Sequence, residues 1–189
     1  MRKIILDLAV TQDGFIEGPN GEIDWCIMED EPDFQNSDFG QFLQSVDTIF
    51  YGRISYELWG NYEPDENANA AVRAIFNSVH KKTKFVFSRT TRNADGKATF
   101  LHSNILERVV EIKRQGGKDI WLYGGGSLIT TFINMGLVDG YRLSVHPLIL
   151  GAGKPLFQDI RQKTNLKLVN VKPAKSGVVL MNYEKMFPV

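Results

Sequence analysis

Short apolar runs alternate along this chain with segments of helical periodicity, and this alternation limits the folds open to it. Strands joined through helices pair in parallel, with helices on both faces of the sheet. Strands are expected at 4–10, 48–52, 84–88, 98–102, 119–123 and 140–150, and helices at 37–47, 54–60, 66–80, 104–117 and 127–136. The residues between 11 and 36 are expected to form a loop.

The last part of the chain departs from this alternation. Two alternating runs lie on either side of a Pro/Gly turn within 165–186, and so short a connection allows only a local antiparallel hairpin. We therefore expect an α/β fold with a mostly parallel central sheet, helices on both faces, and a C-terminal antiparallel hairpin.

Size and charge narrow the class of ligand. The chain has 189 residues, enough for one core and short for two, so we expect a single domain over 1–189. Its 22 basic residues balance its 22 acidic ones, which favours a small-molecule ligand and predicts no nucleic-acid partner. One cysteine, Cys26, and three scattered histidines offer no cluster for a metal ion.

The N-terminal segment "MRKIILDLAV" begins like a signal peptide but does not continue as one. Asp7 interrupts the apolar run, and no small-residue cleavage site follows. No stretch approaches the roughly 20 apolar residues that a membrane-spanning helix needs. We expect a cytoplasmic protein without a membrane partner.

The residues that follow three of the expected strands suit a phosphorylated ligand, because ligands of open α/β sheets gather at the carboxyl ends of the strands. An arginine and a hydroxyl follow the strands that end near 52 and 88, and the glycine run "GGGS" follows the one that ends at 123. The guanidinium fork and bare backbone N–H groups both suit phosphate oxygens. The alternative is that the arginines form surface ion pairs and the glycines only permit a tight turn.

Two common nucleotide motifs do not match this glycine run. A triphosphate-binding loop requires a lysine and then a Ser/Thr after the glycines, where this chain has Ser127 and Leu128. The dinucleotide fingerprint requires a further glycine or alanine where Ile129 stands. ATP hydrolysis and a Rossmann fold are both disfavoured.

A sequence of segments, taken in order, resembles one family over nearly the whole chain. These segments are "DLAVTQDGFIEG", "IDW", "DTIFYGRISYE", "FVFSRT", "IWLYGGGSLI" and "LSVHPLILGAGKPLF". They are similar to the signature segments of the dihydrofolate reductase-like fold, and more specifically to the RibD C-terminal family, the reductase domain of bacterial riboflavin biosynthesis.

The resemblance implies NADPH as the cofactor and assigns it residues. The backbones of Ala9 and Ile16 match the positions that hold the nicotinamide amide. The positions implied for phosphates, pyrophosphate and the adenosine 2'-phosphate are Gly52, Arg53, Ser55, Ser88, Arg89, Gly124, Gly125, Gly126, Ser127 and Leu128. If Gly125 lies against the cofactor, Gly125→Ala is expected to fold with a modest change in stability and to lose NADPH affinity.

The sequence match is less specific for the substrate-binding residues than for the cofactor-binding residues. Dihydrofolate reductases have a carboxylate five residues after a tryptophan, and Asp30 stands in that place after Trp25, whereas Asp24 precedes the tryptophan and is our candidate catalytic carboxylate. Burial beside Trp25 is expected to raise the pKa of Asp24, and the alternative is that Asp24 only caps the loop. Ser144 and His146 share a strand face and are candidates to contact substrate, although a lone histidine before a proline is more often structural.

These expectations combine into one functional prediction. The chain is expected to be an NADPH-dependent reductase that transfers hydride to a small, heterocyclic metabolite resembling a pterin or a flavin precursor. Dihydrofolate reductase proper and a non-catalytic NADP(H)-binding module are the alternatives. Apolar segments at 148–157 and 177–183 predict a homodimer, unless the protein's own helices cover them.

Overall fold

The computed structural model describes residues 1–27, 33–90 and 96–186, and the chain forms two compact units. The first unit consists of Met1–Lys3 and Asp30–Gly125. The second unit consists of Ile4–Glu29 and Gly126–Val189.

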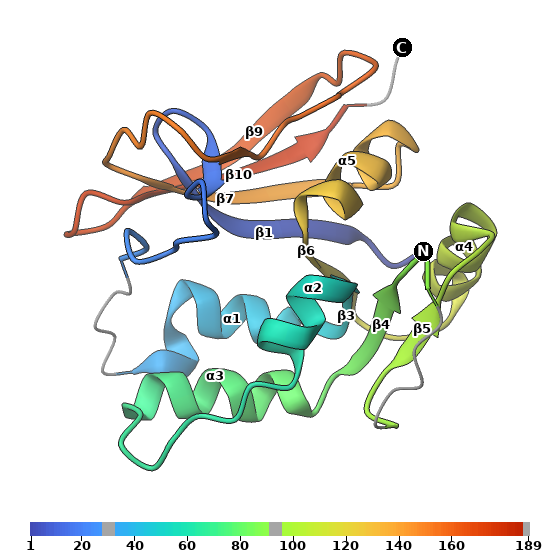
Figure 1. The fold of residues 1–189 in the computed structure, drawn as a ribbon, viewed down its shortest axis with the longest axis horizontal. Helices are drawn as coiled ribbons and strands as arrows, with labels where there is room; N and C mark the ends of the chain where they lie inside the picture. Colours follow the sequence, from blue (N-terminus) through green and yellow to red (C-terminus); the bar gives the residue numbers. More distant parts are fainter. Residues whose placement is uncertain (28–32, 91–95, 187–189) are drawn as a thin grey trace. The chain divides into compact units, whose positions relative to one another are not determined.

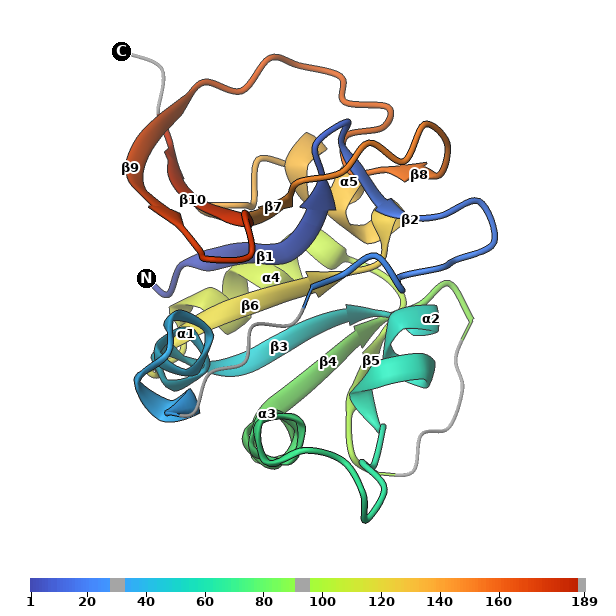
Figure 2. The same ribbon diagram turned by 90° about the vertical axis from the view of Figure 1, so that its left-hand side faces the viewer.

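Four parallel strands form the sheet of the first unit (Figure 2). They are β3 (Val46–Gly52), β4 (Thr83–Phe87), β5 (Thr99–Leu101) and β6 (Asp119–Gly124), in the order β5-β4-β3-β6. Strands covered on both faces read as continuous apolar runs rather than alternating ones. Strand β3 shows this directly, since Ile49, Phe50 and Tyr51 are at most 1% exposed.

Three helices of the first unit form within the segments whose periodicity predicts helices, although α3 begins at Ala70 rather than at residue 66. They are α1 (Asp38–Ser45), α3 (Ala70–His80) and α4 (Ile105–Arg114). Side chains cap two of them: Ser37 Oγ accepts a hydrogen bond from Gly40 N at 2.9 Å, and Asn69 Oδ1 accepts one from Val72 N at 2.8 Å.

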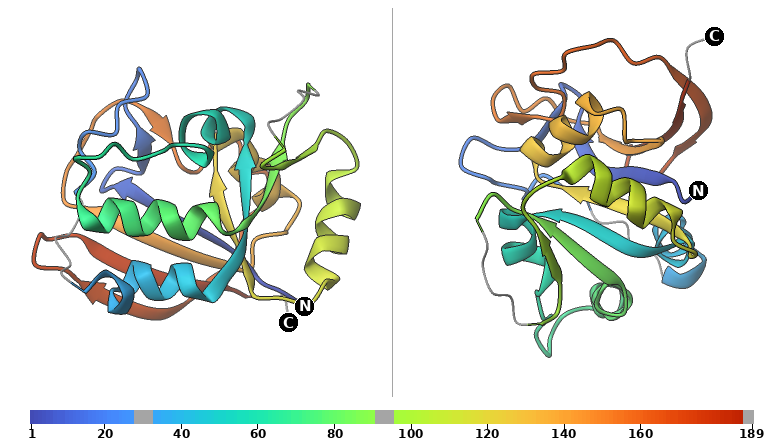
Figure 3. Two further views of the ribbon diagram at one scale, coloured as in Figure 1. Left: turned by 90° about the horizontal axis from the view of Figure 1, so that it is seen from below. Right: turned by 90° about the vertical axis from the view of Figure 1, so that its right-hand side faces the viewer.

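The helices of the first unit cover both faces of its sheet. The chain moves along the sheet in one direction from β3 to β4 and in the other from β5 to β6, so right-handed crossovers place α3 and α4 on opposite faces. Figure 3 shows α1 beside α3 in the view from below, with α4 away from both.

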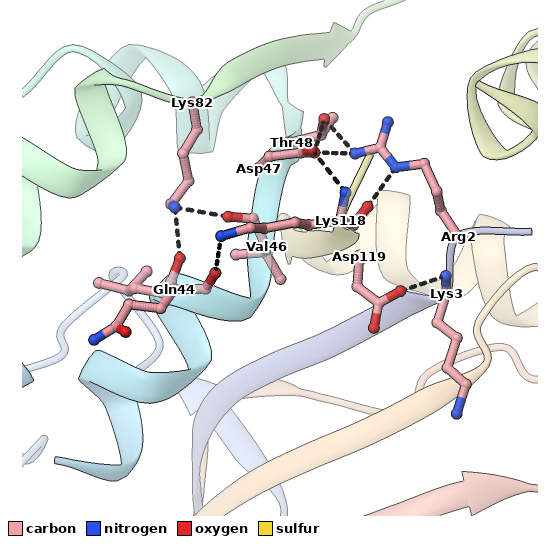
Figure 4. Close-up of polar contacts among 10 residues, drawn as sticks. Arg2, Lys3, Gln44, Val46, Asp47, Thr48, Lys82, Lys118 and Asp119 are labelled. Atoms are coloured by element: carbon pink, nitrogen blue, oxygen red, sulfur yellow. Dashed lines mark hydrogen bonds and ion pairs between the residues drawn. The ribbon is translucent and has the colours of Figure 1, made fainter. Parts of the chain in front are cut away.

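A polar cluster joins β3 to β6 at the amino ends of these strands (Figure 4). The Arg2 guanidinium donates to the Asp47 carboxylate and, at 2.6 Å, to Thr48 Oγ1. Lys118 N donates to the other Asp47 oxygen at 2.8 Å. Burial alone would raise the pKa of Asp47, but these hydrogen bonds and the Arg2 charge lower it overall.

The second unit has a mixed sheet in the order β1-β7-β10-β9 (Figure 1). Strands β1 (Ile4–Thr11) and β7 (Gly140–His146) are parallel, whereas β10 (Val179–Lys185) pairs antiparallel with both β7 and β9 (Leu166–Pro173). The predicted C-terminal hairpin is thereby confirmed. One helix, α5 (Gly126–Asn134), buries Leu128, Ile129, Phe132 and Ile133 at helical spacing.

Two local expectations were wrong, and a third element is a helix of a different type. The segment between 11 and 36 is not all loop, because β2 (Phe15–Glu17) pairs with β8 (Lys154–Pro155), and η1 (Phe34–Asn36) is a short 3₁₀ helix. Such short elements lack a readable period. Strand β7 ends at His146 rather than at 150, since Pro147 has no N–H to continue a ladder. The helix at 54–60 is α2 (Arg53–Ser55) followed by a π-helical turn, η2 (Tyr56–Gly60).

The turn after β1 is fixed by one carboxylate. Asp13 accepts hydrogen bonds from Gly151 N at 2.7 Å, from Leu150 N at 3.1 Å and from Thr11 Oγ1 at 2.7 Å. The bond from Thr11 and the two backbone bonds lower the pKa of Asp13 from 3.8 to about 2, against a smaller opposing effect of burial. Asp13 therefore holds the segment after β1 against the segment that precedes β8.

Candidate functional site

The carboxyl ends of β4, β3 and β6 meet at one edge of the first unit's sheet. The register places Gly52 beside Phe87 and Tyr51 beside Gly124. The strand-end residues identified from the sequence therefore follow neighbouring strands at one edge: Arg53 and Ser55 after β3, Ser88 and Arg89 after β4, and Gly125 after β6.

The polar side chains at this edge differ in whether they form hydrogen bonds or ion pairs within the protein. Arg53 Nη1 lies 2.6 Å from Glu57 Oε2, an i,i+4 ion pair between partly exposed side chains. Ser88 Oγ donates to Thr90 O at 2.7 Å. Arg89 is exposed, and among the described residues no hydrogen bond or ion pair holds it. Arg89 is the cation at this edge best placed to meet an anionic ligand.

The glycines after β6 have a structural reason to be glycine. Gly124 and Gly125 have φ of 112° and 98°, a region that L side chains rarely adopt. A Cβ on Gly125 would lie 3.1 Å from Ser55 Oγ and 3.7 Å from Gly52 Cα. The backbone therefore favours glycine at this position whether or not a cofactor is bound, and the expected modest loss of stability and loss of NADPH affinity in Gly125→Ala stay predictions.

In the second unit, the start of α5 lies close to β2 and β8. A Cβ on Gly126 would lie 3.9 Å from Ile16 Cδ1 and 2.9 Å from Lys154 Cε. The first-turn N–H groups of α5, including those of Ser127 and Leu128, have no partner within the helix. The sequence analysis missed Lys154, whose Nζ lies 3.3 Å from Glu17 Oε2, since only β2–β8 pairing brings this lysine to the helix start.

His146 is buried and holds the segment that contains Trp25. Its ring is 1% exposed, and its Nδ1 accepts a hydrogen bond from Ile27 N at 3.3 Å. Cys26 Sγ lies 3.9 Å from His146 Nε2, and the Trp25 ring meets the imidazole edge-on at 5.3 Å between centroids. Burial raises the pKa of the Cys26 thiol, which keeps it protonated and suits packing rather than nucleophilic attack.

Two charged residues that the sequence analysis did not select face each other in the same sheet. Asp7 on β1 is directly opposite Arg142 on β7, and Asp7 Oδ1 lies 2.9 Å from Arg142 Nε. Both residues are at most 9% exposed. Burial raises the pKa of Asp7 from 3.8 to about 6, and the Arg142 charge opposes that rise. The signal in the sequence was a charge that interrupts an apolar strand.

The structure describes one of the two carboxylates that were selected from the sequence. Asp24 is exposed, so the expectation that it would be buried beside Trp25 was wrong. Asp30 lies outside the described residues. The catalytic role of Asp24 and the substrate roles of Trp25, Asp30, Ser144 and His146 stay predictions.

Comparison with known sequences assigns the family. The sequence profile of the RibD C-terminal domain matches residues 2–180. The chain belongs to the RibD C-terminal domain family. One relative, uncharacterized protein YyaP of Bacillus subtilis, is 57% identical over 182 residues, which cover 96% of this chain and 94% of the relative. Uncharacterized protein YwjB of the same organism is 31% identical, over 95% of this chain and 96% of its own.

Solved structures confirm the dihydrofolate reductase-like fold. A putative riboflavin biosynthesis protein from Shewanella sp. PV-4 superposes with a TM-score of 0.78 at 20% identity, over 99% of this chain and all of its own. Dihydrofolate reductase from Enterococcus faecalis, complexed with NADP(H), superposes with a TM-score of 0.62 at 14% identity, over 97% of this chain and 96% of its own. A third match is a Thermotoga maritima protein, a diaminohydroxyphosphoribosylaminopyrimidine deaminase/5-amino-6-(5-phosphoribosylamino)uracil reductase. It superposes with a TM-score of 0.65 at 16% identity, over 98% of this chain and 57% of its own.

Two properties of the described residues bear on other classes of protein. No helix in them combines the length and apolar character needed to cross a membrane. Within the same ranges, no group of three His, Cys, Asp or Glu side chains is arranged to hold a metal ion.

Proposed function

We propose that this chain is an NADPH-dependent reductase that transfers hydride to a small heterocyclic metabolite, acting as one RibD-type domain over residues 1–189 in the cytoplasm. Membership of the RibD C-terminal domain family supports a reductase. The observation that carries the cofactor assignment is the edge of the first unit, where hydroxyls, an exposed arginine and a glycine turn follow neighbouring parallel strands. Ligands of such sheets bind at the carboxyl ends of the strands.

The donors at this edge have the chemistry that a phosphorylated cofactor needs. Arg89 would hold the 2'-phosphate, with Ser88 beside it, because a guanidinium offers two parallel donors to phosphate oxygens. Arg53 and Ser55 would bind phosphate at the start of α2. Arg53 would then contact both the phosphate and its ion-pair partner Glu57. The turn from Gly124 to Leu128 would lie along the pyrophosphate.

The backbones of Ala9 and Ile16 would contact the nicotinamide, and Lys154 adds a positive charge beside Ile16 at the start of α5. When bound, the cofactor supplies the hydride. The protein's residues bind and orient the ring, and must provide a proton where the acceptor is a C=N or C=O group.

Turnover tests this proposal directly. Loss of the NADPH absorbance is followed in the presence of dihydrofolate or of 5-amino-6-(5-phosphoribosylamino)uracil, the compound after which the Thermotoga reductase is named. The expected result is NADPH oxidation that depends on one of these acceptors. Tight NADPH binding without reduction of either acceptor would favour a non-catalytic binding module, and NADPH oxidation with dihydrofolate alone would favour dihydrofolate reductase proper.

We also propose that the protein is a homodimer with a small-molecule rather than a nucleic-acid partner. Strand β9 ends the strand order of the second unit, and three of its apolar side chains are exposed. These are Leu168 at 51%, Val169 at 57% and Val171 at 45%. An edge strand with apolar side chains on both faces is a surface that a second copy would cover.

A further inference from the structure

One face of the second unit's sheet carries two rows of buried polar residues with a row of two small residues between them. Paired residues of neighbouring strands lie on the same face, so Asp7 and Arg142 form one row, and Thr11 and His146 form another. The row between them consists of Ala9 and Ser144. Both outer rows are buried, whereas Ala9 and Ser144 are only half-buried.

The middle row carries only small side chains beside the ion pair. Neither side chain at Ala9 or Ser144 extends far from the sheet. The predicted nicotinamide contact, the Ala9 backbone, is two residues from Asp7, a spacing of about 7 Å along a strand. An acceptor ring that extends from the nicotinamide along this row would therefore approach the Asp7 carboxyl.

Stability alone gives little reason for an ion pair at this position. Taking two charges out of water costs about as much as their attraction returns, and apolar residues of similar volume are often as stabilising or more so. In the described part of the chain, Asp7 is the one buried carboxylate. Buried charge pairs with shifted ionisation are typical of functional sites.

We propose that Asp7 is the proton donor of the reductase and that Arg142 positions its carboxyl group toward an acceptor held over Ala9 and Ser144. The inference rests on the proposed function, since it assigns the proton that hydride transfer to a C=N or C=O group requires. Its geometry comes from the pairing of β1 with β7 and from the 2.9 Å contact between Asp7 and Arg142.

The step balances with NADPH as the only reductant. Hydride from the dihydronicotinamide forms a C–H bond at the acceptor carbon, and the π bond of the C=N or C=O group breaks. Its nitrogen or oxygen takes the proton from the Asp7 carboxyl, which becomes a carboxylate. Asp7 then regains a proton from water. A carboxyl with a pKa of about 6 is partly protonated near neutral pH and so suits this exchange.

The test compares Asp7→Asn with Asp7→Glu in steady-state kinetics and NADPH binding. The acceptors are dihydrofolate and 5-amino-6-(5-phosphoribosylamino)uracil. Asp7→Asn is expected to lower kcat by about 100-fold, the effect of losing a general acid, with KM changed little. Asp7→Glu, which keeps the acid, is expected to recover part of kcat. Affinity for NADPH, measured by fluorescence, is expected to stay within about twofold for both.

A matched control and a second variant separate a loss of catalysis from a loss of folding. Asp47→Asn removes the carboxylate of another Arg–Asp pair, at the amino ends of β3 and β6, and is expected to keep kcat. If Asp7→Asn does not fold, Asp7→Asn/Arg142→Met removes both charges and leaves no unpaired arginine. Wild-type kcat in folded Asp7→Asn, or in folded Asp7→Asn/Arg142→Met, would overturn the inference while the proposed function stands. A wild-type protein that oxidises NADPH with neither acceptor would overturn both.

Discussion

At the residue scale, the structure differs from the sequence analysis in which carboxylate is buried. The sequence analysis selected Asp24 beside Trp25, but Asp24 is exposed, and among the described residues the buried carboxylate is Asp7. The pattern of β1 showed Asp7 only as an interruption. Its importance depends on Arg142, which lies more than a hundred residues later, and only the parallel pairing of β1 with β7 brings the two together.

The raised pKa of Asp7 predicts a specific dependence of stability on pH. The folded protein holds this proton more tightly than the unfolded chain, so the contribution of Asp7 to the free energy of unfolding falls as pH rises from 3.8 to about 6 and beyond. Between pH 7 and pH 5, wild-type protein is expected to gain about 1 kcal/mol relative to Asp7→Asn. Urea unfolding at the two pH values measures this. Parallel changes in both proteins would place the pKa of Asp7 in its ordinary range.

Gly125 gives a second prediction at this scale. Alanine at a φ of 98°, with its Cβ 3.1 Å from Ser55 Oγ, is expected to lower the free energy of unfolding by about 1–2 kcal/mol. Gly116→Ala is the matched control, because a Cβ there meets nothing within 4 Å and the backbone is not in the left-handed region. Equal stability of the two variants in urea would show that the turn relaxes around the methyl group.

At the element scale, much of the architecture followed from periodicity. The strands and longer helices were predictable because apolar spacing and a cap such as Ser37 are local signals, whereas the start of α3 after Asn69 was placed four residues too early. Strands β2 and β8 were not, since three and two residues carry no period and each depends on the other. The candidate cofactor residues could be selected because strand ends are visible in a sequence, whereas Lys154 and the Asp7–Arg142 pair depend on contacts between distant strands.

Asp13 supplies a prediction about the segment between β1 and β2. Its carboxylate is bonded by Thr11, Leu150 and Gly151, which depresses its pKa, so its stabilising contribution is present above its unfolded pKa of 3.8 and lost as pH falls through about 2. Asp13→Asn is expected to lower Tm at pH 7 and to have a smaller effect at pH 3. A thermal scan at each pH tests this. An equal loss at both would mean that the charge of Asp13 adds nothing.

At the scale of the whole molecule, the proposed homodimer can be tested through β9. Light scattering at micromolar concentration is expected to give a dimer mass, twice the 21.4 kDa of one chain. Val169→Lys places a charge on the exposed apolar edge and is expected to weaken the dimer. Ile54→Lys, which changes an exposed apolar residue of the first unit, serves as the control. A monomer mass for the wild-type protein would rule out the dimer.

The measurement that tests the central claim most directly is the affinity of Arg89→Ala for NADPH and NADH, with Arg108→Ala as the control. Both arginines are exposed, but Arg89 follows β4 at the proposed phosphate edge, whereas Arg108 pairs with Glu111 on α4. A charge-assisted bond contributes roughly 1.5–3 kcal/mol, so Arg89→Ala is expected to weaken NADPH by about tenfold or more and to leave NADH nearly unchanged. Arg108→Ala is expected to change neither. Equal losses for the two cofactors, or none, would contradict the placement of NADPH at this edge.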